Sequence, residues 1–156
     1  MKKHSLYPLA FTGAMLPMAA NADCGEISIA QMDWTSGGVN AGVMEFLLEQ
    51  GYGCDVTLVP SSTTTSIASV AENNEPDVVA ELWVNSAPSY TRLEEAGRVV
   101  KASDAFSDGA TEHWLVPSYL VEEHPELATA EGIMANPELV GGRFHSCPDG
   151  WGCRFV

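Results

Sequence analysis

The C-terminal segment holds the residues whose types and spacing point most directly to chemistry. Cys147 and Cys153 lie six residues apart and enclose the turn-forming run Pro148-Asp149-Gly150 and a tryptophan, Trp151, between two glycines. A disulfide across this short loop would hold the indole at a fixed angle. The face of a fixed indole attracts cations, including quaternary ammonium groups, which neither donate nor accept hydrogen bonds. The loop therefore indicates a site for such a cation.

Three further tryptophans could contribute to the same site. Trp34 follows the first predicted strand and Trp83 ends the third. Ligands of open α/β sheets bind beyond the carboxyl ends of the strands, so we expect both indoles to lie over one crevice. Trp114 opens a predicted fourth strand, and for this residue core packing stays open as an alternative to ligand contact. Several converging indoles suit a quaternary ammonium group better than a sugar, which would also need many hydrogen bonds.

Charged and backbone groups near the crevice extend this hypothesis. If a helix begins at Gly152-Cys153, its free backbone N–H groups would bind an anion without a lysine. Such a site would accept the carboxylate of a zwitterionic ligand. Glu81 and Glu112 are carboxylates within possible reach of the crevice, although acidic residues are abundant in this chain and most are expected to be exposed.

The cysteine count is even, which predicts disulfides in an exported protein. Four cysteines allow three pairings, and proximity in the sequence favours Cys147–Cys153. That pairing leaves Cys24–Cys54, which would tie the start of the mature chain to the entry of the second strand. The alternative use of the thiols is a metal site completed by His113 or His145.

Sequence motifs give little support to an enzyme. Neither Cys-x-x-Cys nor His-x-x-x-His spacing occurs, so a metal is not predicted. No Gly-x-Ser-x-Gly motif and no glycine-rich phosphate loop is present. We therefore expect no cofactor and no catalysis.

The N-terminal segment, residues 1–22, has the pattern of a secretory signal peptide. Lys2-Lys3 is followed by a short apolar run, Leu6 to Met18, and by the small-residue cleavage site Ala20-Asn21-Ala22. The expected location is periplasmic, and no other stretch is predicted to cross a bilayer. A formal net charge of −14 argues against nucleic acid or anionic lipid as a partner.

The remaining sequence alternates between strand and helix patterns. Strands are predicted at 26–32, 54–59 and 78–83, which gives parallel βαβ units and an α/β fold. The helices between and after them are predicted from the apolar positions Val39, Val43, Phe46 and Leu47, from Ile67, Val70 and Ala71, and from the run Pro88 to Ala96 before Gly97. A fourth strand at 115–120, a helix at 129–135 and a strand at 143–146 follow.

Taken together, these segments resemble the substrate-binding proteins of ABC importers for glycine betaine, proline betaine and choline. The resemblance covers the mature chain from Cys24 onward, and the cysteine loop is its most specific motif. The matching segments are Asp33-Trp34-Thr35-Ser36, Gly51-Tyr52, Pro76-Asp77-Val78, Leu82-Trp83, Val116-Pro117 and Cys147-Pro148-Asp149-Gly150-Trp151-Gly152-Cys153.

This resemblance implies a type II periplasmic-binding-protein fold, in which two α/β lobes close around the ligand. It implies an aromatic cage for the ammonium group, with backbone N–H groups of Gly152 and Cys153 receiving the carboxylate. The cage tryptophans are Trp83 and Trp151, with Trp34 matching the choline-type branch and Trp114 near a further aromatic position. The implied partner is the permease subunit of an ABC importer.

Members of this family are longer than the present sequence. We therefore expect a truncated chain, with the first lobe at 23–117 nearly complete and the second lobe only begun at 118–156. Two alternatives from other classes stay open: a small secreted interaction module stapled by disulfides, and a thiol or metal enzyme, which would require free thiols.

Overall fold

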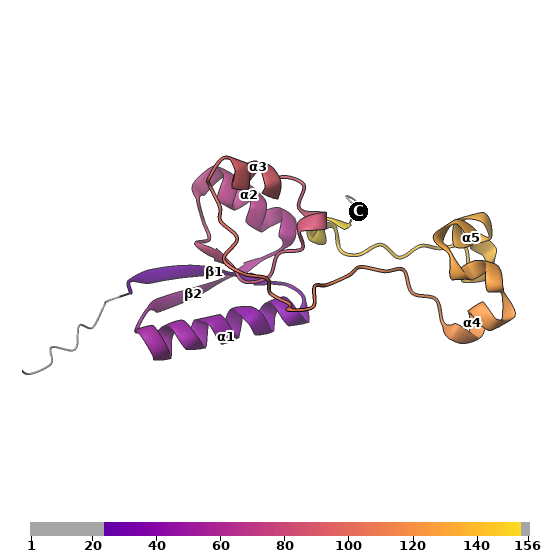
Figure 1. Cartoon of the computed structure of the whole chain (residues 1–156), viewed down its shortest axis with the longest axis horizontal. Coiled ribbons are helices and arrows are strands. Elements are labelled where there is room, and N and C mark those ends of the chain that lie inside the picture. The colour runs from indigo at the N-terminus through magenta and orange to yellow at the C-terminus, as the bar shows by residue number, and fades with distance from the viewer. Residues whose placement is uncertain (1–23, 154–156) are drawn as a thin grey trace, which may run out of the picture.

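The computed structural model describes residues 24–153, and its larger part is built on a three-stranded parallel sheet (Figure 1). The strand order is β2-β1-β3. β1 pairs with β2 along its whole length, and with β3 only at Ile29 and Ala30. This arrangement confirms the predicted α/β class and the parallel strands. The strands are β1 (Glu26–Met32), β2 (Asp55–Ser61) and β3 (Val78–Val79).

Three helices accompany the sheet, each where the sequence predicted one. α1 packs on β1 and β2, while α2 and α3 lie on the opposite side of the sheet (Figure 1). α1 ends at Gly53, whose φ of 72° is left-handed and favours glycine. The helices are α1 (Thr35–Tyr52), α2 (Thr63–Asn73) and α3 (Tyr90–Glu95).

The apolar positions that predicted α1 do not form its buried face, because the helix is apolar on two sides. The positions Val39, Val43, Phe46 and Leu47 are all more than half exposed. The side that faces the sheet instead carries Ala41, which joins Ile29, Cys54 and Val56 in the buried core, with Met44 and Leu48 beside them. The small side chain of Ala41 lets the helix approach the sheet closely, so the bulkier face is turned outward.

The third strand is shorter than predicted. Residues 80–83 leave the sheet after Val79, and a 3-10 turn, η1 (Val84–Ser86), follows. The alternating sequence pattern of residues 78–83 continues beyond Val79, so the pattern could not show where the strand ends. The departure has a polar cause, since the side chain of Glu81 is hydrogen-bonded to residues at the start of α1.

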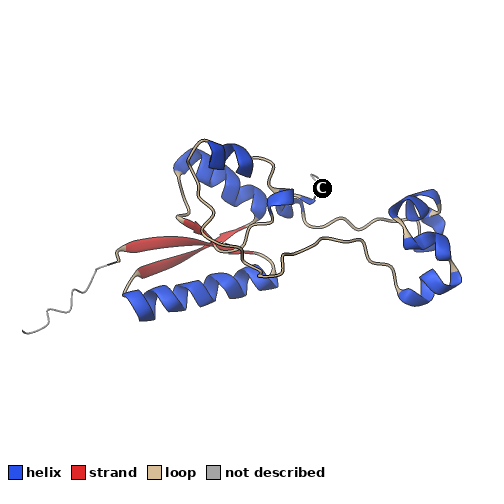
Figure 2. Ribbon diagram, viewed as in Figure 1, coloured by secondary structure: helices blue, strands red, loops and turns tan. Residues whose placement is uncertain are grey.

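A separate group of short helices lies beyond two extended segments, 110–117 and 143–146 (Figures 1 and 2). Leu127 and Ile133 are its buried apolar residues. We call residues 118–140 the helical group, and residues 24–109 with the loop 147–153 the sheet body. The helical group contains α4 (Ser118–Glu123), η2 (Pro125–Ala128), α5 (Ala130–Ala135) and η3 (Pro137–Val140).

Two strand predictions in this region are wrong, and one helix prediction is confirmed. The segment predicted as a strand at 115–120 enters α4 after Pro117, because a proline restrains only the residue before it to an extended shape. The segment 143–146 is extended but pairs with no strand among residues 24–153. α5 fulfils the predicted helix at 129–135, and the Thr129 hydroxyl caps it by accepting a hydrogen bond from the Gly132 N–H at 3.0 Å.

Both predicted disulfides are present. Cys24–Cys54 joins the chain two residues before β1 to the residue before β2, with Cα atoms 4.6 Å apart, and contributes to the core. Cys147–Cys153 closes the C-terminal loop, with Cα atoms 6.2 Å apart. The predicted signal peptide at 1–22 lies outside the described residues.

Candidate functional site

A buried carboxylate, Glu81, is the polar centre of the sheet body. Its side chain is 2 % exposed and lies just after β3. Oε1 accepts hydrogen bonds from the indole Nε1 of Trp34 at 2.7 Å, from Trp83 Nε1 at 2.9 Å and from the Ser36 hydroxyl at 3.0 Å. Oε2 accepts one from Asn40 Nδ2 at 2.7 Å. These four donors replace the water that burial removes from the carboxylate.

The end of β1 and the first turn of α1 place Trp34 beside this carboxylate. Trp34 is the residue before α1, and its backbone oxygen accepts the N–H of Gly38 at 3.0 Å. Gly37 is buried under the indole: a Cβ at that position would lie 2.6 Å from Met32 Cβ and 2.9 Å from Trp34 Nε1. A glycine at 37 is therefore required for the indole to reach Glu81.

The third tryptophan of the site, Trp151, comes from the C-terminal loop. Its Nε1 donates to Asp33 Oδ1 at 2.6 Å, and its ring centroid lies 5.5 Å from that of Trp34, with the planes at 70°. Trp34 and Trp83 share Glu81 as a hydrogen-bond partner, and Trp151 joins them through its contact with Trp34. All three indole N–H groups are bonded to carboxylates, which leaves only π-faces for other contacts.

Contacts from α2 and η1 hold the cysteine loop against the sheet body. The Thr64 hydroxyl, in the first turn of α2, donates to the Gly150 carbonyl at 3.2 Å. Within the loop, η4 (Asp149–Trp151) ends at Gly152, whose φ of 81° is left-handed. Gly152 lies directly against the Ser86 backbone, so a side chain at 152 would collide with η1. The loop is therefore docked on two elements of the sheet body as well as closed by its disulfide.

Ser86 places an additional polar group beside this loop. It is 2 % exposed, and its hydroxyl is the one buried side-chain oxygen in residues 24–153 that has no hydrogen-bond partner. The predicted helix start at Gly152-Cys153 falls at the edge of the described residues, and its continuation lies outside them. Ser86 and Gly152 are nevertheless neighbours, because a Cβ on Gly152 would meet the carbonyl oxygen and Cβ of Ser86.

An open depression of about 370 Å³ lies at the carboxyl ends of β1 and β2. Trp34 is the one tryptophan that lines it, so the described residues do not form a closed aromatic box. Trp34 and Trp151 meet edge to face, and this contact occupies the space between them. The lining residues are Gln31, Met32, Asp33, Trp34, Thr35, Gly38, Pro60 and Ser61.

Trp114 is in different surroundings. It contacts Phe144, with ring centroids 4.6 Å apart, and so joins the two extended segments. It lines a second depression, of about 380 Å³, which shares no lining residue with the first. The structure therefore does not bring Trp114 to the other three tryptophans. Glu112, the second carboxylate expected near the crevice, is exposed and makes no hydrogen bond within the described part of the chain.

With this geometry established, the chain can be compared with known families. The family model OpuAC, the substrate binding domain of ABC-type glycine betaine transport systems, matches residues 25–156. The chain belongs to this family. A comparison with curated proteins found no match. The three-stranded parallel sheet agrees with an OpuAC binding-protein domain.

Membership in the OpuAC family settles the class of activity. The domain binds a substrate for glycine betaine-type ABC transport, and it is not an enzyme. This outcome excludes the enzyme alternative and disfavours the separate interaction module. The family and the two disulfides indicate an extracytoplasmic protein. Among the helices of residues 24–153, none is long and apolar enough to cross a membrane.

Several neighbours of the OpuAC site could not be found from the sequence. Phe106 lies 6.4 Å from Trp83 between ring centroids, but no motif or spacing links the two residues. Ser36 and Asn40 are ordinary polar residues of a helix until the fold brings Glu81 to them. The i, i+4 spacing of these two residues puts them on one helix face, and this was the only available signal.

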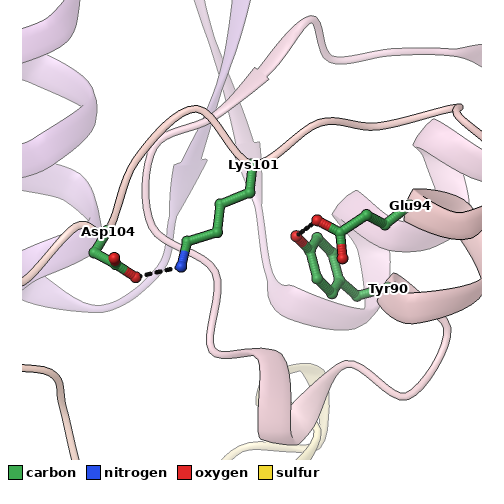
Figure 3. A network of polar contacts seen from close by, with 4 residues as sticks. All are labelled: Tyr90, Glu94, Lys101 and Asp104. Atoms are coloured by element: carbon green, nitrogen blue, oxygen red, sulfur yellow. Dashed lines mark hydrogen bonds and ion pairs between the residues drawn. The ribbon is translucent and has the colours of Figure 1, made fainter.

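Polar contacts near α3 are local to the surface (Figure 3). The Tyr90 hydroxyl donates to Glu94 Oε1 at 2.7 Å, and this hydrogen bond raises the pKa of Tyr90 above its usual value. Lys101 Nζ forms an ion pair with Asp104. None of these four residues bonds to the tryptophan cluster.

Proposed function

We propose that this OpuAC domain captures glycine betaine or a related quaternary ammonium compound, such as choline or proline betaine, for a permease of the ABC class. One observation carries the proposal: the indole N–H groups of Trp34, Trp83 and Trp151 are all bonded to carboxylates. The three rings therefore offer π-faces and no hydrogen-bond donors. A quaternary ammonium group needs faces of this kind and has no use for donors.

The proposed aromatic cage consists of Trp34, Trp83 and Trp151, with Trp114 as an outer member. Trp34 and Trp151 meet edge to face, and a bound ammonium group would separate these two rings. Trp114 would approach when the helical group moves toward the sheet body. Its contribution is therefore expected to be the smallest of the four.

The carboxylate of a betaine is proposed to bind beside the cysteine loop. The backbone N–H groups of Gly152 and Cys153 are the proposed donors. Ser86 supports this position, because its backbone and Cβ lie against Gly152 and its buried hydroxyl has no hydrogen-bond partner within residues 24–153. A ligand carboxylate would satisfy that hydroxyl.

The two parts of the structure are proposed to correspond to two lobes. Residues 23–117 would form the first lobe and 118–156 the beginning of the second. The extended segments 110–117 and 143–146 would then act as the hinge. Residues 1–22 would direct export to the periplasm.

Tryptophan fluorescence tests the proposed function on the full-length gene product. Titration with glycine betaine and with choline should shift or quench the emission, because the ligand displaces the Trp34–Trp151 contact. Glycine is the matched control, since it has the same carboxylate but no methylated nitrogen, and should leave the emission unchanged. No change with either quaternary ammonium ligand at millimolar concentration would contradict the proposal.

A further inference from the structure

We infer that Glu81 is a positioning residue that orients the indoles of Trp34 and Trp83 and, through its charge, selects for positively charged ligands. The inference rests on the proposed function, because it concerns the same site. The carboxylate does not need to touch the ligand. It acts through the two rings that it holds and through the field that it creates at their faces.

Positioning follows from the shared acceptor. Trp34 and Trp83 are separated by 49 positions in the sequence, yet both donate to Glu81 Oε1, at 2.7 and 2.9 Å. Each ring is thereby tied at its nitrogen edge to one point, and this hydrogen bond makes no use of the ring faces. Because both half-buried rings depend on one atom, moving that atom changes the orientation of both.

Charge selection follows from the neutral character of the partners. All four donors to Glu81 are uncharged: two indoles, the hydroxyl of Ser36 and the amide of Asn40. Among residues 24–153, the close contacts between basic and acidic side chains are Lys101–Asp104 and His124–Glu126, and neither includes Glu81. A buried negative charge without a positive partner attracts a cation that binds nearby.

The same charge would act on the two ends of a zwitterion in opposite directions. It draws the ammonium group toward the faces of Trp34 and Trp83 and repels the carboxylate. The repelled carboxylate would be favoured on the side of Gly152. Removing the charge therefore affects a purely cationic ligand more strongly than a zwitterion.

Glu81→Gln tests the charge on the full chain, with tetramethylammonium as the cation and glycine betaine as the zwitterion. Affinity for tetramethylammonium should fall by about tenfold or more, and affinity for glycine betaine by about threefold. The ratio of the two affinities should thus change by about threefold. Because the glutamine amide cannot accept all four bonds, the near-UV circular dichroism of the ligand-free protein should change as well.

Two further variants should change the two ligand affinities by smaller amounts. Glu81→Asp keeps the charge but withdraws it by one methylene, so the near-UV spectrum should change and the affinity ratio should shift by less than in E81Q. Ser36→Ala is the matched control, since it removes one donor and keeps the charge. It should change both affinities by the same small factor. If E81Q does not fold by far-UV circular dichroism, E81D carries the test.

Two results together would overturn the inference. E81Q and E81D would each lower the affinity for both ligands by the same factor, and their near-UV spectra would match that of the wild type. Failure of the proposed function looks different, because the wild type itself would then bind neither ligand. In that case charge selection is refuted too. The ligand-free spectra of E81Q and E81D would still decide whether Glu81 positions the indoles.

Discussion

The sheet body and the extended segments that lead to the helical group hold their tryptophans in different ways. In the sheet body, the indoles of Trp34, Trp83 and Trp151 are each anchored by a carboxylate, and Glu81 is buried beneath two of them. Trp114, on the path to the helical group, is 55 % exposed and makes a tilted ring contact with Phe144. No hydrogen bond of its indole occurs in the described region.

This difference shows that the tryptophans of the sheet body can be oriented without any contact from the helical group. A ring tied by a hydrogen bond to a buried charge loses its side-chain freedom when the domain folds, so less entropy remains to be lost upon ligand binding. A ring held only by stacking keeps more of that freedom. The sheet body should therefore supply most of the affinity, and the helical group should supply closure.

The largest expected effect concerns the disulfide between Cys24 and Cys54. Replacing Cys24 and Cys54 by serine opens a loop with a sequence separation of 30 and should lower the free energy of unfolding by about 3–4 kcal/mol. The corresponding change at Cys147 and Cys153, with a separation of 6, should cost about 2 kcal/mol. Urea denaturation measures both losses, and equal losses would contradict the ranking.

The second-largest expected effect tests whether the helical group and the sheet body have independent cores. Leu127 is 1 % exposed in the helical group, and Leu127→Ala should cost about 2–3 kcal/mol locally. Hydrogen exchange should speed up in α4 and α5 and stay slow in β1, because the buried residues around Ile29 belong to another cluster. Loss of protection in β1 as well would mean that the two parts unfold as one unit.

Anchored and stacked tryptophans should differ in their contribution to binding. Trp83→Ala removes a ring fixed by Glu81 and should weaken glycine betaine binding by about five- to thirtyfold, which corresponds to about 1–2 kcal/mol. Trp114→Ala should weaken it by about threefold or less. Isothermal titration calorimetry measures both changes. Similar losses for the two variants would show that Trp114 belongs to the cage on equal terms.

Local sequence patterns predicted those parts of the fold that depend on residues close together in the sequence. The alternating sequence of β1 and the glycine after α1 are local signals, and the structure has a strand and a left-handed helix end at these positions. The outward face of α1 shows the limit, because choosing between two apolar faces requires knowing what covers each one. Glu81 shows the same limit for the site. Its four donors come together only after β1, β3 and α1 have assembled, so no spacing could identify them.

The smallest expected effect tests a polar contact at the edge of the sheet, away from the tryptophans. The Ser28 backbone N–H and hydroxyl donate to Asp77 Oδ2 at 2.8 and 2.7 Å, and the hydroxyl bond is the main cause that lowers the pKa of Asp77. A lowered pKa in the folded state means that the ionised carboxylate stabilises the fold. That stabilisation is complete above the pKa of the unfolded carboxyl, about 3.9, and disappears as the pH falls through the folded value.

Because Asp77 is exposed, solvent screening reduces this contribution to about 0.5 kcal/mol. Asp77→Asn should therefore be less stable than the wild type by about this amount at pH 7, and the gap should narrow below about pH 4. Urea denaturation of both proteins across this range measures the gap, and effects common to both cancel in the difference. A gap that stays constant down to about pH 2, well below the unfolded pKa, would show that the loss comes from the geometry of the substituted amide. The charge of Asp77 would then contribute nothing to the pairing of β1 with β3.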